Sequence, residues 1–70
     1  MNRISVESSN LSSVGYDFEM RVLEIEFHGG GIYQYSNVTE SDYNGLMNAE
    51  SKGKYFAQHI KNKYDYRKVG

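Results

Sequence analysis

The clearest pattern in the sequence is an alternation of apolar and polar residues along residues 21–27. Leu23, Ile25 and Phe27 fall on one side of an extended chain, and two glutamates fall on the other. Residues 11–17 show a weaker alternation of the same kind, in which two apolar side chains lie two positions apart. Both stretches therefore predict β-strands.

Three consecutive glycines at positions 29–31 predict a tight hairpin turn before a further strand, residues 32–36. Tyr33 and Tyr35 project from the same face of that strand. A loop with an odd number of residues would place both rings on the apolar face, whereas a two-residue loop would place them beside the glutamates, where they could stack on bases. So small a core needs more apolar mass, which favours the odd loop.

After the third strand the apolar spacing becomes helical, which predicts helices in the second half of the chain. Thr39–Asp42 resembles a helix capping box, with Asp42 in place of the usual glutamate. Tyr43, Leu46 and Met47 form the narrow apolar stripe of a short helix. This helix is predicted to rely on packing, because Gly45 inside it costs roughly 1 kcal/mol relative to alanine.

A second helix is predicted from a cap at Ser51 to about Tyr66. Its apolar stripe packs on the alternating strand and completes a small core. The side chains expected to be most buried are Leu23, Ile25, Phe27, Leu46, Phe56 and Ile60.

These elements predict an α+β fold, a three-stranded antiparallel β meander followed by two helices packed on one face. With 70 residues, of which 39% are hydrophobic, the chain has room for one domain, residues 1–70, with residues 1–5 and 67–70 as candidates for loosely ordered ends. The absence of cysteine excludes a disulfide framework and a cysteine zinc site. No apolar run is long enough to span a membrane and no secretory signal is evident, so we expect a cytoplasmic location.

Charge is distributed unevenly along the chain, although the net charge is −1. Residues 1–49 carry two basic and seven acidic side chains, a net charge of −5, and residues 50–70 carry six basic and two acidic side chains, a net charge of +4. The basic end interleaves cations with rings that can stack on bases, which is typical of a nucleic-acid interface. The candidate contact residues are Lys52, Lys54, Tyr55, His59, Lys61, Lys63, Tyr66, Arg67 and Lys68. The alternative is an ordinary charged helix face whose tyrosines anchor it to the sheet.

Metal and catalytic chemistry have little support in the sequence. Glu24, Glu26 and His28 would share a strand face, but no fourth ligand is evident, so we expect an exposed strand face and no metal site. No catalytic triad or phosphate-binding loop can be assigned, so we expect no catalytic residues and no cofactor. Ser51 and Gly53 could present helix N–H groups to a phosphate, but a structural cap is the favoured interpretation.

One ordered set of residues runs through almost the whole chain. It comprises Val14-Gly15-Tyr16-Asp17, Leu23-x-Ile25-x-Phe27, Tyr33-x-Tyr35, Val38, Ala49-x-Ser51-x-Gly53-x-x-Phe56, Ile60 and Tyr64. This set resembles the KTSC domain family across residues 6–64, with Thr39 at a position where many members would carry proline.

The KTSC family is named for a segment at the C-terminus of some lysyl-tRNA synthetases, and members also occur as short bacterial and phage proteins. The resemblance implies that Tyr33, Tyr35, Ser51, Gly53 and Phe56 belong to the family motif, and it suggests RNA binding. We therefore expect a small non-enzymatic binding module that contacts RNA through a basic second helix. The alternative is a protein-interaction or self-association module that uses the edges of the sheet.

Overall fold

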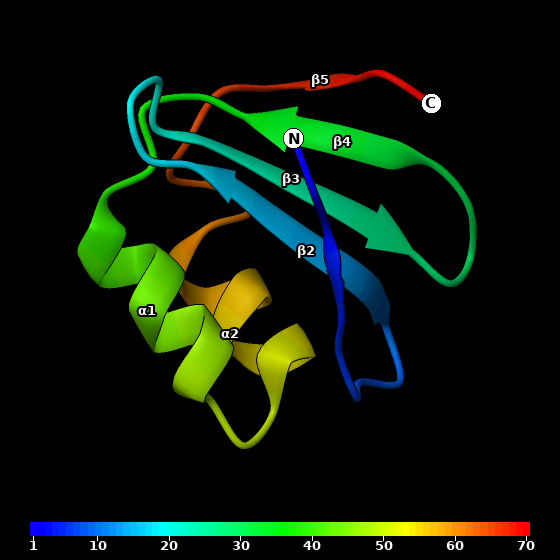
Figure 1. Ribbon diagram of the computed structural model, residues 1–70. Helices are drawn as coiled ribbons and strands as arrows, with labels where there is room; N and C mark the ends of the chain where they lie inside the picture. The colour runs from blue at the N-terminus through cyan, green and yellow to red at the C-terminus, as the bar shows by residue number, and fades with distance from the viewer.

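The computed structural model describes residues 1–70 as one antiparallel sheet with two helices packed against one side of it (Figure 1). The strands lie across the sheet in chain order, so each pairs with its neighbour in the sequence. Neither helix is long and apolar enough to cross a lipid bilayer. In chain order the elements are β1 (Ile4–Ser5), β2 (Leu11–Asp17), β3 (Val22–Phe27), β4 (Ile32–Tyr35), α1 (Glu40–Asn48), α2 (Lys52–His59) and β5 (Tyr66–Lys68).

The sheet has five strands, so the expected three-stranded meander is an undercount. The two additional strands lie near the chain ends: β1 pairs Ile4 and Ser5 with β2, and β5 pairs Tyr66–Lys68 with β4. Parts of residues 1–5 and 67–70, the candidates for loose ends, are thus held by strand pairing. The sequence carries only a weak alternation near β1, at Ile4 and Val6, which is compatible with an edge strand or a loosely held arm, and none at β5. Both strands form because the edges of β2 and β4 offer unpaired backbone groups.

The second helix is shorter than expected, because α2 ends at His59 and its predicted continuation is wrong. Ile60 leaves helical geometry with φ −120° and ψ −47°, and the chain then turns through residues 61–64. It returns beside β4, where the Ser36 N–H donates to the Asp65 carbonyl at 2.9 Å. Neither glycine nor proline marks this break, so contacts with the rest of the fold outweigh the helical spacing.

The β3–β4 hairpin has the odd loop that the sequence favoured. The Phe27 N–H donates to the Gly31 carbonyl at 3.1 Å and the Gly30 N–H donates to the Phe27 carbonyl at 3.1 Å, which leaves residues 28–30 in the loop. Gly30 and Gly31 have φ values of 125° and 92°, a region that residues with a Cβ rarely adopt. The loop therefore needs these glycines.

This register places the two β4 tyrosines on the core side of the sheet. Tyr33 lies opposite Ile25, and Tyr35 lies opposite Leu23. Tyr35 is buried and Tyr33 is partly buried against the core, which confirms the expected shared face.

Nine buried side chains form the core between the sheet and the helices. Those expected from the spacing are Leu23, Ile25, Leu46, Phe56 and Ile60. The core also contains Tyr35, which the odd loop was expected to place on this face, and Leu11, Val14 and Val38, which were not among the side chains expected to be most buried. Phe27 was expected in this group but is only partly buried, because it lies at the hairpin end of β3, away from most of the helical cover (Figure 1).

We expect Phe56→Ala to lower the free energy of unfolding by about 3–5 kcal/mol, because it empties a buried ring site. Phe27→Ala should cost less, since part of that ring already contacts solvent. Urea denaturation followed by circular dichroism measures both losses. Phe18→Ala is the matched control, because the Phe18 side chain is exposed. Equal losses for Phe27→Ala and Phe56→Ala would contradict the difference in burial.

Candidate functional site

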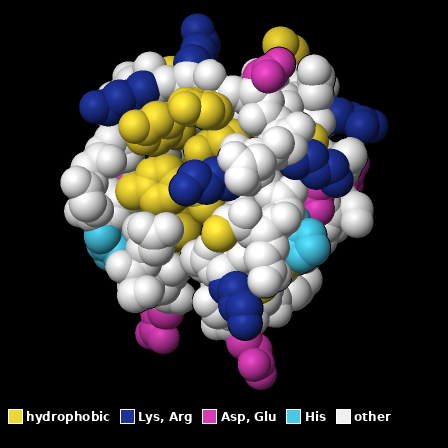
Figure 2. All heavy atoms as spheres, turned by 180° about the vertical axis from the view of Figure 1, so that it is seen from behind, with side chains coloured by type: hydrophobic (Ala, Val, Ile, Leu, Met, Phe, Trp, Pro, Cys, Tyr) yellow, Lys and Arg dark blue, Asp and Glu magenta, His cyan; other side chains and the backbone are white.

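An open groove lies on the face shown in Figure 2, where apolar side chains gather with basic side chains beside them. Its volume is about 320 Å³. Five rings line it, and we call it the aromatic groove: Phe27, Tyr33, Tyr35, Phe56 and Tyr66. They come from β3, β4, α2 and β5, so only the folded chain brings them together.

The five rings form a closed circuit in which each ring packs against two others. Neighbouring ring centroids are 5.3 to 5.8 Å apart, within the range of favourable aromatic pairs. Tyr35 lies at the floor with 4% of its surface exposed, and Tyr66 lies at the rim with 60% exposed. The groove therefore combines a fixed floor with an accessible ring at its rim.

The hydroxyl of Tyr35 makes no hydrogen bond to another protein group and keeps access to solvent through the groove. Burial raises the pKa of Tyr35 to about 12, with smaller contributions from Tyr66 and Tyr33. The hydroxyl is consequently neutral at physiological pH and is available to a ligand as a donor or an acceptor.

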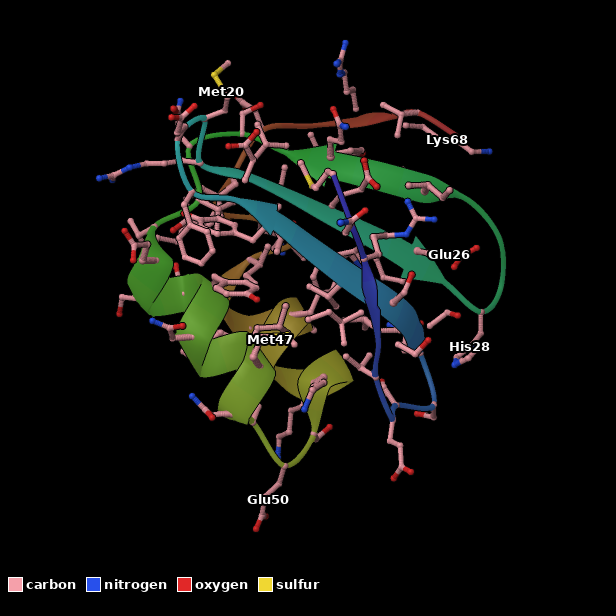
Figure 3. All side chains as sticks on the ribbon, viewed as in Figure 1. Met20, Glu26, His28, Met47, Glu50 and Lys68 are labelled. Carbon is pink, nitrogen blue, oxygen red and sulfur yellow. The ribbon has the colours of Figure 1, made fainter.

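Polar side chains complete the lining of the aromatic groove. Asn10, Lys61 and Asn62 are its non-aromatic residues. Lys68 pairs with Tyr33 across β4 and β5, and Figure 3 shows its side chain extending from the outer strand of the sheet. Two cations therefore lie in or near a groove whose walls are aromatic.

The residues predicted to form one basic helical face are divided among three elements, so that geometry is wrong. Only Lys52, Lys54, Tyr55 and His59 lie on α2. Lys61 and Lys63 follow in the turn, and Tyr66, Arg67 and Lys68 form β5. Of the nine, the fold brings Lys61 and Tyr66 together at the aromatic groove.

Three of the predicted cations already have partners within the protein, and one of them, Lys52, donates from Nζ to the Ala49 carbonyl at 3.2 Å. Arg67 points to the other face of the sheet, where its Nη2 donates to Gln34 Oε1 at 3.2 Å. Lys63 Nζ donates to Asp42 Oδ2 at 3.0 Å. These cations are thus less available to a ligand than Lys61 and Lys68.

A family model of the KTSC domain matches residues 7–64. The chain belongs to the KTSC domain family. Its fold is very similar to the crystal structure of a KTSC domain protein from Yersinia pestis, with a TM-score of 0.96 and 45% sequence identity over 99% of this chain and 97% of that one. The resemblance inferred from the ordered residues is therefore confirmed.

Relatives of this KTSC domain occur both as short proteins and within longer ones. A protein of Stutzerimonas stutzeri is 41% identical over 61 residues, which cover 87% of this chain and 86% of the relative. A lysine–tRNA ligase of Nostoc punctiforme is 35% identical over 63 residues, which cover 90% of this chain but 11% of the ligase. The chain thus corresponds to a small part of that enzyme.

Four of the five family-motif residues lie at the groove of this KTSC domain. Those that line it are Tyr33, Tyr35 and Phe56. Gly53 lies against the groove residue Asn10, since a Cβ on Gly53 would be 3.4 Å from the Asn10 Cβ. Ser51 is the cap of α2, because its Oγ accepts a hydrogen bond from the Lys54 N–H at 3.3 Å. The structural interpretation of Ser51 is therefore confirmed.

A buried carboxylate joins the two helices and the turn that follows α2. Asp42 is 8% exposed, and it accepts hydrogen bonds from Tyr55 Oη at 3.0 Å, Lys63 Nζ at 3.0 Å and Tyr64 Oη at 2.5 Å. Burial alone would raise the pKa of Asp42, but hydrogen bonds from Tyr64, Lys63 and Tyr55 together outweigh it and hold the pKa below its ordinary value. Asp42 thereby holds the chain on both sides of Lys61, at Tyr55 in α2 and at Lys63 and Tyr64 in the turn.

From the sequence, Asp42 was interpreted only as part of a capping box, and only one of the two hydrogen bonds of such a box is formed. Thr39 Oγ1 does accept from the Asp42 N–H at 3.1 Å, but the Asp42 side chain turns inward instead of back to Thr39. The inward orientation of Asp42 could have been predicted from its position four residues before Leu46, which places both residues on the buried face of α1. Gly45 also has a packing role, since a Cβ there would be 2.1 Å from the Tyr55 hydroxyl.

The glutamates of β3 do not form the exposed face that was expected. Glu24 is 8% exposed, beneath the Arg3 guanidinium, which pairs with its carboxylate, and Gln34 Nε2 donates to it at 2.8 Å. The hydrogen bond from Gln34 lowers the pKa of Glu24, burial opposes this, and Arg3 adds to the lowering. The Glu26 carboxylate accepts a hydrogen bond from the Ser13 hydroxyl. His28 lies at the hairpin end of β3 (Figure 3). The side chains of Glu24, Glu26 and His28 therefore do not converge on a common point.

We expect Asp42→Asn to lower the free energy of unfolding at pH 7 by roughly 1.5–3 kcal/mol, because buried hydrogen bonds to a charged group are lost. The folded pKa of Asp42 lies below its unfolded value of about 3.9. The ionised Asp42 carboxylate therefore stabilises the folded state fully above its unfolded pKa, and this stabilisation is lost as the pH falls through the folded pKa.

Thermal unfolding measured across the pH range tests whether the stabilisation by Asp42 is lost at low pH. The difference in Tm between the wild type and Asp42→Asn should narrow below about pH 4. Asp65→Asn is the matched control, because Asp65 is exposed and its side chain makes no hydrogen bond. A Tm difference that stayed constant down to pH 2 would contradict the assignment.

Proposed function

We propose that this KTSC domain is a non-enzymatic binding module for single-stranded nucleic acid, and that unpaired bases enter the aromatic groove. The observation that carries the proposal is the circuit of five rings, open to solvent and bordered by Lys61. Aromatic side chains stack on any base, and each stacked base contributes about 1–3 kcal/mol. A cation beside the rings attracts the phosphate that every base carries with it.

The distribution of charge supports the groove better than the rest of the sheet as the binding surface. Lys61 and Lys68 lie in or near the groove and make no ion pair within the protein. On the other side of the sheet, Arg3 is paired with Glu24 and Arg67 is bonded to Gln34, so these cations are less available to a phosphate. The proposal thus moves the expected RNA contact from a helix face to the groove, and of the two tyrosines expected to stack on bases it keeps Tyr66 and leaves out Tyr55.

The family relationship adds support of a different kind. A relative of this domain forms part of a lysine–tRNA ligase, whose name states that it acts on tRNA. A small module attached to such an enzyme is well suited to hold RNA, and a nucleic-acid partner agrees with the cytoplasmic location expected from the sequence.

The alternative of a protein-interaction module built on sheet edges has less support. The edges on which it depended, those of β2 and β4, are occupied by β1 and β5. The new edge strands are short and carry polar or charged residues, features that disfavour pairing with a further strand.

We expect Lys61→Gln to weaken binding of a single-stranded RNA decamer and to reduce the slope of log K against log salt by about 0.7, the value for one lost phosphate contact. Tyr66→Ala should cost about 1–3 kcal/mol of binding free energy, because it removes the exposed stacking ring. Fluorescence anisotropy at several salt concentrations measures both effects. A hairpin duplex should respond to Lys61→Gln but little to Tyr66→Ala, since paired bases cannot stack on the ring.

Lys54→Gln is the matched control, because Lys54 lies on α2 outside the groove and carries the same charge. It should change the affinity and the salt slope less than Lys61→Gln does. If the decamer does not bind at low salt, or if the two lysine variants behave alike, the groove is not the nucleic-acid site.

A further inference from the structure

The aromatic groove contains three polar side chains that no protein group satisfies. They are the amides of Asn10 and Asn62 and the hydroxyl of Tyr35. Tyr35 is the most informative of them, because only 4% of its surface is exposed and its hydroxyl nevertheless lacks a partner within the protein. The hydroxyl keeps access to solvent through the groove, and Asn10 and Asn62 are exposed, so a ligand in the groove would replace solvent as the partner of all three groups.

The rings and the cations of the groove cannot distinguish one base from another. Every base has a π-face to stack, and every nucleotide has a phosphate. Side-chain amides can distinguish bases, because each presents a donor and an acceptor in one plane. Asn10 comes from the connection between β1 and β2, and Asn62 from the turn after α2, so two amides reach the same groove from separate segments.

We propose that the groove selects adenine among unpaired bases, with Asn10 and Asn62 as the specificity-determining residues and the Tyr35 hydroxyl as a further contact to the base edge. This inference rests on the proposed function and names the ligand of that same site. Adenine presents an acceptor beside its amino donor on the Watson–Crick edge and again on the Hoogsteen edge. An amide is the complement of that pair. The other three bases present such a pair on the Watson–Crick edge alone, so adenine is the base that two amides can bind together, one at each edge.

The test uses four uridine pentaribonucleotides that differ only in the central base, which is A, C, G or U. We expect the pentamer with central adenine to bind about tenfold more tightly than the all-uridine pentamer, which is the scale of one good amide–base pair. Fluorescence anisotropy at fixed low salt gives the four dissociation constants. The backbone charge is the same in all four, so phosphate contacts cannot produce a difference.

Two variants connect any preference to the groove. Asn10→Ala with Asn62→Ala should reduce the adenine preference to less than about twofold, because the amides are lost while the rings and Lys61 remain. Alanine keeps the Asn10 Cβ that faces Gly53, so the local packing is preserved. Tyr35→Phe should weaken the adenine pentamer more than the all-uridine pentamer. Asn44→Ala is the matched control, since Asn44 is an exposed residue of α1 outside the groove.

The outcomes separate this inference from the proposed function. Binding of all four pentamers with equal affinity, or a preference for another base, would overturn adenine selection and leave the single-strand site standing. An adenine preference that survives the double asparagine variant would overturn the assignment of the two amides. Failure of every pentamer to bind, with circular dichroism showing folded protein, would overturn both proposals.

Discussion

The hydrogen bonds to the Asp42 carboxylate hold the turn after α2, and the shape of the groove depends on that turn. Tyr55 of α2 and Lys63 and Tyr64 of the turn all donate to this one side chain of α1. A carboxylate in so buried a position is tolerated only because its oxygens are satisfied, and the same requirement keeps its donors in place. The burial of Ile60 and the pairing of β5 with β4 act in the same direction, so that the residues after His59 leave the helix and return along β4.

The return along β4 creates both the fifth strand and the candidate site. Tyr66 pairs with Tyr35, and Lys68 pairs with Tyr33. This pairing brings a ring and a cation to the side of the sheet on which Phe56 of α2 packs. The ring circuit is therefore the open end of the hydrophobic core, and core packing and ligand binding use the same side chains. The core has only nine buried residues, so substitutions of the groove residues that belong to it also lower the stability of the domain.

The two faces of the sheet differ in their electrostatics for a related reason. On the face away from the helices, Arg3 and Gln34 bind the Glu24 carboxylate, and Arg67 binds Gln34 in turn. Most charged groups on that face therefore already have partners within the protein. On the groove side Lys61 and Lys68 make no ion pair, which makes this the surface on which a negatively charged ligand would meet available cations.

Local spacing in the sequence was sufficient for β2, β3, β4, the odd hairpin loop, the caps of both helices and most of the core, because each depends on neighbouring residues and on which face they share. It also singled out Tyr33, Tyr35, Phe56, Lys61 and Tyr66, but it divided them between a core and a basic helix. The end of α2, strand β5, the partners of Asp42, and the presence of Asn10 and Asn62 in one groove were decided only by the tertiary structure. Each of these depends on groups distant in the chain, such as an open strand edge or a buried carboxylate, whose attraction outweighs a weak local preference and leaves no pattern in the sequence.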